Sequence, residues 1–273
     1  MSFTLQKNLR KRLKRLFVVL LALYVMIGSA LYFFQEKMMF LPTTLERDYA
    51  YSFNHPFEEL FFKKEADAEI NALHFKAKNT KGVLLYFHGN AGDLSRWGKI
   101  TEFFVDQDYD VLVMDYRTYG KSKGPLSETA LYSDAQYCYD YLLKHYPEDK
   151  IGLYGRSLGT GIASYIASKN KPQQLILETP YYSIADVAQN RFPLLPVKRL
   201  LKYRFPTNQY LPNTSCPITI IHGTEDNLVP YTSGKKLYDL NLDNLNFVTV
   251  EGGKHNDLIN YQRFRTTIQD LLR

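Results

Sequence analysis

A serine between two glycines is the residue of this chain whose setting most clearly points to chemistry. Ser157 is the centre of Gly-Arg-Ser-Leu-Gly at 155–159, directly after the apolar run 151–154 and before a helical pattern with Ile162 and Ile166. A sharp turn between strand and helix exposes a serine hydroxyl, and glycines two residues away on each side let the backbones approach closely. The pattern predicts a nucleophilic serine, with an ordinary strand-to-helix turn as the alternative.

A histidine must accept the proton of such a serine, because a hydroxyl is weakly nucleophilic at neutral pH. His255 lies in the loop 252–257 after the apolar run 247–250, where the carboxyl edge of a parallel sheet is expected. His222, directly after the apolar run 218–221, is its rival. The histidines expected to be surface or packing residues are His55, His74 and His145.

A carboxylate is needed to orient the base, and this arrangement orders serine, acid and histidine along the chain. Asp226 follows the run 218–221 by a few residues and precedes a helical pattern, with Glu225 as its neighbour. The alternative for a carboxylate in such a loop is a helix cap. Ser157, Asp226 and His255 are therefore the predicted catalytic residues.

Two N–H donors must stabilise the oxyanion that forms when serine attacks a carbonyl, and removing one costs about 2.7–4 kcal/mol. The backbone of Leu158 is the first predicted donor. The second is Asn90 in the glycine-bearing turn 88–92, which follows the apolar run 82–87. His88 is expected to hold this turn.

The elements that must position these residues follow a strand-and-helix rhythm. From residue 82 onward, short apolar runs alternate with longer helical patterns, which predicts parallel βαβ units. The earlier segments 57–64 and 69–76 suggest an antiparallel hairpin at the sheet edge. We expect an α/β fold with a mostly parallel sheet of about eight strands and helices on both faces. A proline-rich, aromatic insertion at about 181–215 interrupts the rhythm and predicts a small lid.

An apolar run near the N-terminus predicts a membrane anchor. Residues 16–34 are uncharged and long enough to cross a bilayer core of about 30 Å. The alternative is a cleaved signal peptide, although its apolar region usually has only about 7–15 residues. The chain then divides into a basic N-terminus (1–15), the transmembrane segment (16–34), a connector (35–55) and one catalytic domain (56–273).

The net charge of +6 is concentrated in that basic N-terminus. Six basic residues precede the apolar run, and the rest of the chain carries 28 basic and 28 acidic residues. A neutral body argues against a nucleic-acid partner. A basic flank predicts a cytoplasmic N-terminus and a domain on the extracytoplasmic side of a single-pass membrane protein. Cys138 and Cys216 are expected to be two separate buried thiols rather than a disulfide.

Motifs for cofactors and metals fail on inspection. Gly120-Lys121-Ser122 resembles the end of a phosphate loop, but Asp115 stands where the first glycine is required. Gly159 and Gly161 lack the third glycine of a dinucleotide fingerprint, and no histidines are paired at metal spacing. We therefore expect no cofactor and no metal.

The assembled motifs resemble the Bem46-like branch of the α/β hydrolases, which includes the ABHD13 and ABHD17 groups. The resemblance covers nearly everything after residue 35 and rests on segments 87–92, 115–120, 155–161, 222–230 and 253–257. It implies a serine hydrolase with an α/β-hydrolase fold, one anchoring helix and a small lid. It also implies Ser157, Asp226 and His255 as the triad, with Asn90 and Leu158 as oxyanion donors.

One residue departs from the family pattern. Thr118 stands where the family usually has glycine in Asp-Tyr-Arg-Gly-Tyr-Gly, which puts the local turn in doubt but not the chemistry. Asp115, at the start of the same segment, is expected to be structural because the triad already has an acid.

The first functional hypothesis is a hydrolase of esters or thioesters that forms an acyl-enzyme at Ser157, with a small-molecule acyl substrate. Phe192, Leu194 and Leu195 in the lid suit an apolar acyl group but could equally be core. A serine aminopeptidase is the enzymatic rival, since the same triad cleaves amides. A binding protein without turnover is the rival of another class, although no triad member is missing. The oligomeric state is left open.

Overall fold

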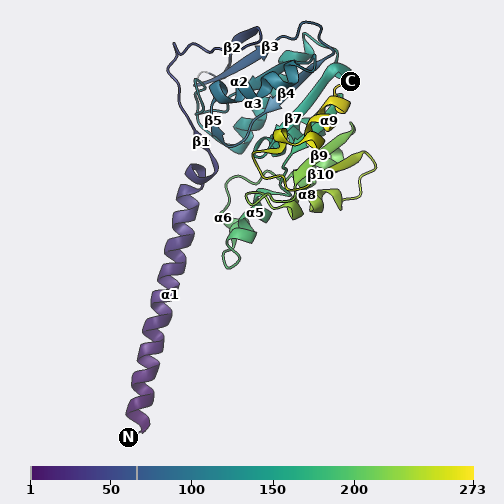
Figure 1. Cartoon of the computed structure of the whole chain (residues 1–273). Helices are drawn as coiled ribbons and strands as arrows, with labels where there is room; N and C mark the ends of the chain where they lie inside the picture. The colour runs from purple at the N-terminus through teal and green to yellow at the C-terminus, as the bar shows by residue number, and fades with distance from the viewer. Residues whose placement is uncertain (1, 66) are drawn as a thin grey trace.

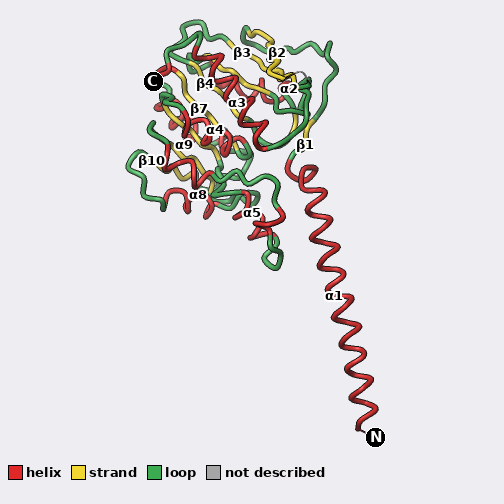
Figure 2. Tube along the Cα trace, turned by 180° about the vertical axis from the view of Figure 1, so that it is seen from behind, coloured by secondary structure: helices red, strands yellow, loops and turns green. Residues whose placement is uncertain are grey.

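The computed structural model describes residues 2–65 and 67–273, which form a long helix and an α/β body. Helix α1 (Ser2–Met39) projects away from the body, and the carboxyl end of the chain lies on the body (Figure 1). The view from behind shows strands enclosed by helices in the body, with α1 standing apart (Figure 2). The expected fold class is confirmed.

The body is built on an eight-stranded sheet in the order β10-β9-β8-β7-β4-β6-β3-β2. Neighbouring strands are parallel except for the β2–β3 and β3–β6 pairs, so the hairpin forms the antiparallel edge as expected. The strands are β2 (Phe57–Glu65), β3 (Ala68–Phe75), β4 (Val83–Phe87), β6 (Asp110–Met114), β7 (Ile151–Arg156), β8 (Gln174–Glu178), β9 (Ile218–Gly223) and β10 (Leu245–Val250).

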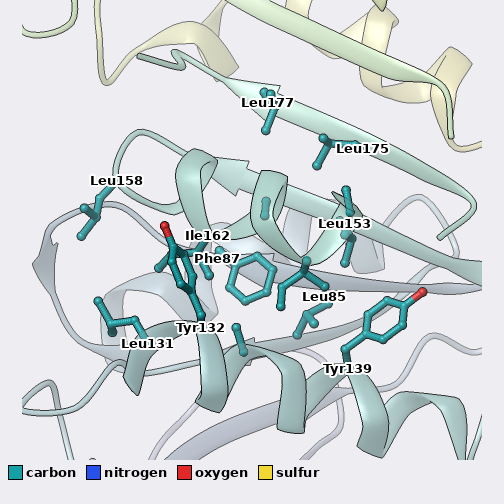
Figure 3. Packing of buried hydrophobic residues seen from close by; sticks show 14 of the residues in the cluster. Leu85, Phe87, Leu131, Tyr132, Tyr139, Leu153, Leu158, Ile162, Leu175 and Leu177 are labelled. Atoms are coloured by element: carbon teal, nitrogen blue, oxygen red, sulfur yellow. The ribbon is translucent and has the colours of Figure 1, made fainter. Parts of the chain in front are cut away.

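Helices cover both faces of this sheet and bury its central strands, every residue of β4, β7 and β8 included. One apolar core lies under α3 (Glu128–Leu143) and α4 (Gly159–Lys169). The other lies under α2 (Leu94–Val105) and α9 (Gln262–Leu271). Figure 3 shows the first core, where Tyr132 and Ile162 from the two helices meet Phe87 of β4. Burial on both faces explains why the central strands are continuous apolar runs.

Residues 181–215, which we call the lid segment, consist of short helices between β8 and β9. These are α5 (Ile184–Arg191), α6 (Val197–Leu200), α7 (Thr207–Tyr210) and the 3₁₀ turn η2 (Leu211–Asn213). The helix that follows β9 is α8 (Tyr231–Tyr238). In both whole-chain views the loop around α6 extends from the body toward the same side as α1 (Figures 1 and 2).

Three boundaries differ from the sequence-based expectation. Helix α1 continues to Met39, past the end of the uncharged run. The connector then forms β1 (Leu41–Pro42), which pairs in parallel with β5 (Ala91–Gly92). Two residues are too few to show a periodic pattern, so the sequence does not predict this contact. The last helix begins at Gln262 rather than near Asn256, because the 3₁₀ turn η3 (Leu258–Asn260) comes first.

Within the described residues, one helix is long and apolar enough to cross a membrane. It covers Gln6–Met39 and contains an 18-residue window with a mean hydropathy of 2.4. No part of that window is buried against the body, so its leucines and valines are exposed. Helix α1 is therefore a candidate membrane anchor.

Candidate active site

The turn between β7 and α4 presents Ser157 in a strained conformation. Its φ is +50°, in the left-handed region that side chains other than glycine rarely adopt. The Ser157 N–H donates to the Glu178 carbonyl at 3.0 Å, which ties the turn to β8. A Cβ on Gly159 would lie 2.1 Å from the Phe87 carbonyl oxygen, and one on Gly155 would lie 2.7 Å from the Gly159 oxygen. The two glycines are thus required by the close approach of α4 to the strands.

The structure brings Ser157, His255 and Asp226 together in one chain of hydrogen bonds. Ser157 Oγ lies 2.8 Å from His255 Nε2, and His255 Nδ1 lies 2.7 Å from Asp226 Oδ2. With Nδ1 protonated, the histidine donates to the carboxylate and its Nε2 can accept the serine proton. Ser157, His255 and Asp226 are only 9%, 7% and 5% exposed, so the bonds are largely shielded from water. This arrangement can generate a serine nucleophile.

The carboxylate of Asp226 is stabilised in its ionised form. Burial alone would raise its pKa, but hydrogen bonds with His222 and His255 and with the Val229 N–H outweigh burial, so the pKa lies well below its ordinary value. Leu228 N–H and Val229 N–H both donate to Oδ1 at 2.9 Å. The group that orients the histidine therefore stays charged at neutral pH.

The rival base His222 lies behind the acid rather than beside the serine. Its Nε2 is 3.3 Å from Asp226 Oδ2 and 3.0 Å from the Val229 carbonyl oxygen, and its ring is fully buried. Glu225, the carboxylate next to Asp226 in the chain, is exposed. The geometry favours His255 over His222 and Asp226 over Glu225.

The turn that carries Asn90 lies next to the serine. A Cβ on Gly89 would be 3.8 Å from Ser157 Cβ. In the part of the chain that the structure describes, neither the Asn90 N–H nor the Leu158 N–H has a hydrogen-bond acceptor. Both N–H groups are therefore free to donate to a bound group.

Sequence reasoning missed the groups that fix the Asn90 turn from outside. The Asn90 carbonyl accepts from the Leu41 N–H at 2.8 Å and from Tyr119 Oη at 2.7 Å. Leu41 belongs to the connector directly after α1, so this turn is joined to the end of the long helix. Tyr119 comes from a segment quoted for the resemblance, but neither residue carries a sequence signal for this contact.

His88 holds the same turn from inside, and Asp115, which was expected to be structural, supports His88. His88 Nδ1 lies 2.6 Å from the Gly89 carbonyl oxygen, and its Nε2 lies 3.4 Å from Asp115 Oδ1. The His88 ring stacks on Trp97. Burial raises the pKa of Asp115, which also accepts from the Leu94 N–H at 3.2 Å. Both residues act as supports at a distance from the serine hydroxyl.

The backbone conformation of Thr118 explains why glycine is favoured at this position. Its φ is +78°, a left-handed conformation, and its side chain is exposed. The turn therefore forms with threonine, at a conformational cost of roughly 1–2 kcal/mol. The departure from the family pattern leaves the turn itself intact.

The remaining candidate groups lie apart from the serine. Cys138 and Cys216 are free and buried, and burial raises the pKa of the Cys216 thiol to about 12. His74 is packed between Tyr141 and Tyr146, and His55 contacts Asp106 near the surface. Within the described residues, no group of three histidine, cysteine or acidic side chains could hold a metal ion.

A cavity of about 540 Å³ lies between the lid segment, the end of α1 and the loop that follows Asp226. Its lining includes Phe192 and Leu195 but neither Ser157 nor His255, and Leu194 is 86% exposed. Asn227 and Leu228 are the part of the lining closest in sequence to the triad. The cavity is therefore adjacent to the acid side of the site rather than centred on the serine.

Comparison with known proteins places this geometry in a family. Residues 82–178 match the family model of the α/β hydrolase fold. A putative α/β hydrolase of Acanthamoeba polyphaga mimivirus is 30% identical over 246 residues, covering 86% of this chain and 90% of that protein. The lysophosphatidylserine lipase ABHD12 of Danio rerio is 32% identical over 195 residues, covering 64% of this chain and 50% of that protein.

A solved structure shares the fold over almost its whole length. The Pyrococcus furiosus esterase Pf2001 superposes with a TM-score of 0.66 at 18% identity, covering 86% of this chain and 97% of that one. At this identity the likeness shows the fold alone. The mimivirus relative, aligned over nine tenths of its length, shows more: the chain belongs to the α/β hydrolase family.

Proposed function

We propose that this α/β hydrolase is a membrane-anchored serine hydrolase that cleaves carboxylic ester or thioester bonds. The observation that carries the proposal is the unbroken series of hydrogen bonds from Ser157 through His255 to Asp226. Each distance is short enough for proton transfer or charge stabilisation, and the order along the chain is that of the fold.

The proposed reaction begins when Ser157 Oγ attacks the substrate carbonyl and its proton passes to His255 Nε2. Asp226 stabilises the imidazolium that forms, because its carboxylate is charged and in contact with Nδ1. The N–H groups of Asn90 and Leu158 donate to the oxyanion. Collapse of the tetrahedral intermediate expels the alcohol or thiol, which takes the proton from His255.

Deacylation repeats these steps with water as the nucleophile. His255 Nε2 accepts a proton from the water as its oxygen attacks the acyl carbon. The second intermediate then releases the acid, and the proton returns to Ser157 Oγ. No redox change occurs, and the enzyme is regenerated.

One relative and one protein of the same fold favour an ester as the substrate. One is described as a lysophosphatidylserine lipase, and a protein of the same fold is described as an esterase. We carry from these only the bond class, since the chain spans half of the lipase and shares only the fold with the esterase.

The anchor belongs to the same proposal. Helix α1 would cross the bilayer with its basic end in the cytoplasm, and the hydrolase domain would lie on the other side. Reporter fusions at the two ends of the chain test this topology. If a reporter that works only in the cytoplasm is active when it is fused to the carboxyl end, the proposed topology is wrong.

The decisive experiment is labelling of the detergent-purified full chain with a fluorophosphonate probe. Wild-type protein should be labelled, Ser157→Ala should not, and Ser168→Ala in the following helix α4 should behave as wild type. Hydrolysis of p-nitrophenyl esters, acyl thioesters and aminoacyl amides then separates the bond classes. Absence of labelling in folded wild-type protein would sink the serine mechanism, and preference for amides would favour a peptidase.

A further inference from the structure

Helix α1 and the lid segment contact each other at several levels along the helix. Directly after the helix, the Phe40 ring packs against Tyr203 with ring centroids 4.9 Å apart. One turn earlier, the Gln35 side chain donates to the Leu200 carbonyl at 3.1 Å and accepts from the Lys202 N–H at 2.7 Å. The lid segment is therefore fastened to the helix as well as to the body.

The lowest contact lies inside the apolar run. Tyr24 Oη donates to the Leu194 carbonyl at 3.1 Å. Tyr24 is ten residues before Phe34, or about 15 Å along the helix axis. Because residues 16–34 are the part of α1 that fits a bilayer core, the tip of the lid segment lies beside the membrane-crossing part of the helix. Leu194, at that tip, is 86% exposed.

The backbone at this tip is suited to an apolar environment, where unpaired N–H and C=O groups are costly. The Leu194 carbonyl is bonded to Tyr24, and the Pro193 carbonyl accepts from the Gln189 side chain at 2.9 Å. The Leu195 N–H donates to Phe192, and Pro193 and Pro196 have no N–H to satisfy. The tip thus combines exposed apolar side chains with a largely paired backbone.

The charge of the lid segment matches a membrane surface. It carries a single acidic residue, Asp186, and five basic residues: Arg191, Lys198, Arg199, Lys202 and Arg204. Long basic side chains can extend their charged ends toward anionic headgroups while their stems stay in apolar surroundings. An apolar tip with a basic surround fits a leaflet that contains anionic lipids.

The 540 Å³ cavity lies at this junction, and part of its wall belongs to α1. Leu31 and Met38 of α1 face Val187 and Phe192 of the lid segment, and Leu228 closes the side next to Asp226. Its volume is within the range of small-molecule sites, and its lining is mainly apolar. Leu31 lies within the apolar run 16–34 and Met38 shortly after it, so the cavity borders the end of the membrane-crossing part of the helix.

We propose that the tip of the lid segment, Phe192 to Val197, inserts into the membrane beside α1, and that the cavity between the lid segment and α1 takes the acyl chain of a bilayer lipid. The anchor is then one wall of the substrate site rather than only a tether. This inference rests on the proposed hydrolase function for its substrate, but the membrane contact can be tested without catalysis.

The first test measures the depth of the tip by fluorescence. Leu194→Cys and Leu143→Cys each place a reactive cysteine at an exposed leucine, whereas Cys138 and Cys216 are buried. The full chain is labelled with an environment-sensitive nitrobenzoxadiazole dye and reconstituted in phosphatidylcholine–phosphatidylglycerol vesicles.

Doxyl-labelled lipid should quench the dye at 194 and iodide should not, with the reverse pattern at 143, at the carboxyl end of α3. Iodide quenching at 194 equal to that at 143 overturns membrane insertion.

The second test narrows the cavity. Ala188→Trp fills it from α5, and Ala185→Trp on the same helix is the matched control because Ala185 does not line it. We expect Ala188→Trp to lower the ratio of kcat/KM for a dodecanoyl over an acetyl ester about tenfold, and the control to change it less than about twofold. Equal ratios in the two variants overturn the acyl site.

The two proposals fail in different ways. If wild-type protein neither binds a fluorophosphonate nor cleaves the acetyl ester, the hydrolase mechanism is wrong, whatever the dye reports. If it does both but the dye at 194 is in water, only the membrane-inserted acyl site is wrong.

Discussion

The carboxyl edge of the sheet and the lid segment are built on opposite principles. At the sheet edge, Ser157, Asp226 and His255 follow buried parallel strands and bond to one another and to the backbone. In the lid segment, α5 has no buried residue, and α6 and α7 are four residues long. The first region is held by the whole core. In the lid segment, residues 184–200 have only Leu195 and Val197 as buried side chains, although Tyr203, Phe205 and Leu211 further along pack into the core.

The difference between the two regions matches two tasks, which are to position the triad and to let the substrate reach it. A triad must keep its geometry within a fraction of an ångström, which packed strands can provide. A segment that admits substrate benefits from low local stability, as regions that move in proteins do. We expect substitutions at the sheet edge to have large, global effects and substitutions in the lid segment to have small, local ones.

The largest effect should come from Asp226→Asn. The amide cannot balance an imidazolium and favours the wrong histidine tautomer, so kcat for a short ester should fall by about 10⁴-fold. Asp239→Asn, the same change at an exposed aspartate directly after α8, should stay within about threefold. Steady-state kinetics with both variants makes the comparison, and a loss below tenfold for Asp226→Asn would show that the sheet edge does not depend on this acid.

The next largest effect compares the two regions that pack against α4, which are strand β4 and the lid segment. A Cβ at 159 would meet the β4 backbone, while one at 161 would meet Tyr181 Oη at 2.3 Å, a side chain of the lid segment. Backbone cannot move, so Gly159→Ala should lower the free energy of unfolding by about 3 kcal/mol and Gly161→Ala by about 1 kcal/mol. Urea denaturation measures both. A larger loss for Gly161→Ala would mean that the lid segment is as rigid as the sheet.

A buried histidine in β3, next to the antiparallel edge strand of the sheet, should make stability depend on pH. Burial, then the Lys76 ammonium, lowers the pKa of His74 to about 4, although Asp110 acts in the other direction. The unfolded chain therefore binds the proton more readily, and stability is lost as pH falls from 6.5 toward 4. His74→Gln should remove about 2 kcal/mol of the decrease between pH 6.5 and about pH 5. Denaturation at each pH measures it, and parallel curves would contradict it.

The smallest effect is a matched pair of helix caps. Ser183 Oγ accepts from the Asp186 N–H at the start of α5, and Ser127 Oγ accepts from the Ala130 N–H at the start of α3. Each cap is worth about 1 kcal/mol. Ser127→Ala should lower global stability by that amount, since α3 is packed on the core.

Ser183→Ala should instead leave the thermal midpoint unchanged and speed amide exchange in residues 184–191 only. Hydrogen exchange with mass spectrometry distinguishes the two responses. A shift of the midpoint by Ser183→Ala equal to that of Ser127→Ala would remove the distinction between the lid segment and the core.

Local pattern accounts for much of what was predicted. Each central strand is a run of residues buried on both faces, so its position is written in its composition. The elbow at Ser157 is signalled by glycines that the close approach of α4 requires. Element ends were less predictable: the last helix begins at Gln262, where the chain leaves a 3₁₀ turn that has no distinctive periodicity.

The sequence by itself determined the fold class, the candidate triad Ser157, Asp226 and His255, and the apolar helix, because each depends on residue types at short spacing. Only the tertiary structure decided that His222 lies behind Asp226 and that the connector at Leu41 pairs with the Asn90 turn. It also decided that α1 and the lid segment share a cavity. Such contacts join residues distant in the chain, and no local pattern specifies which of them the folded chain will bring together.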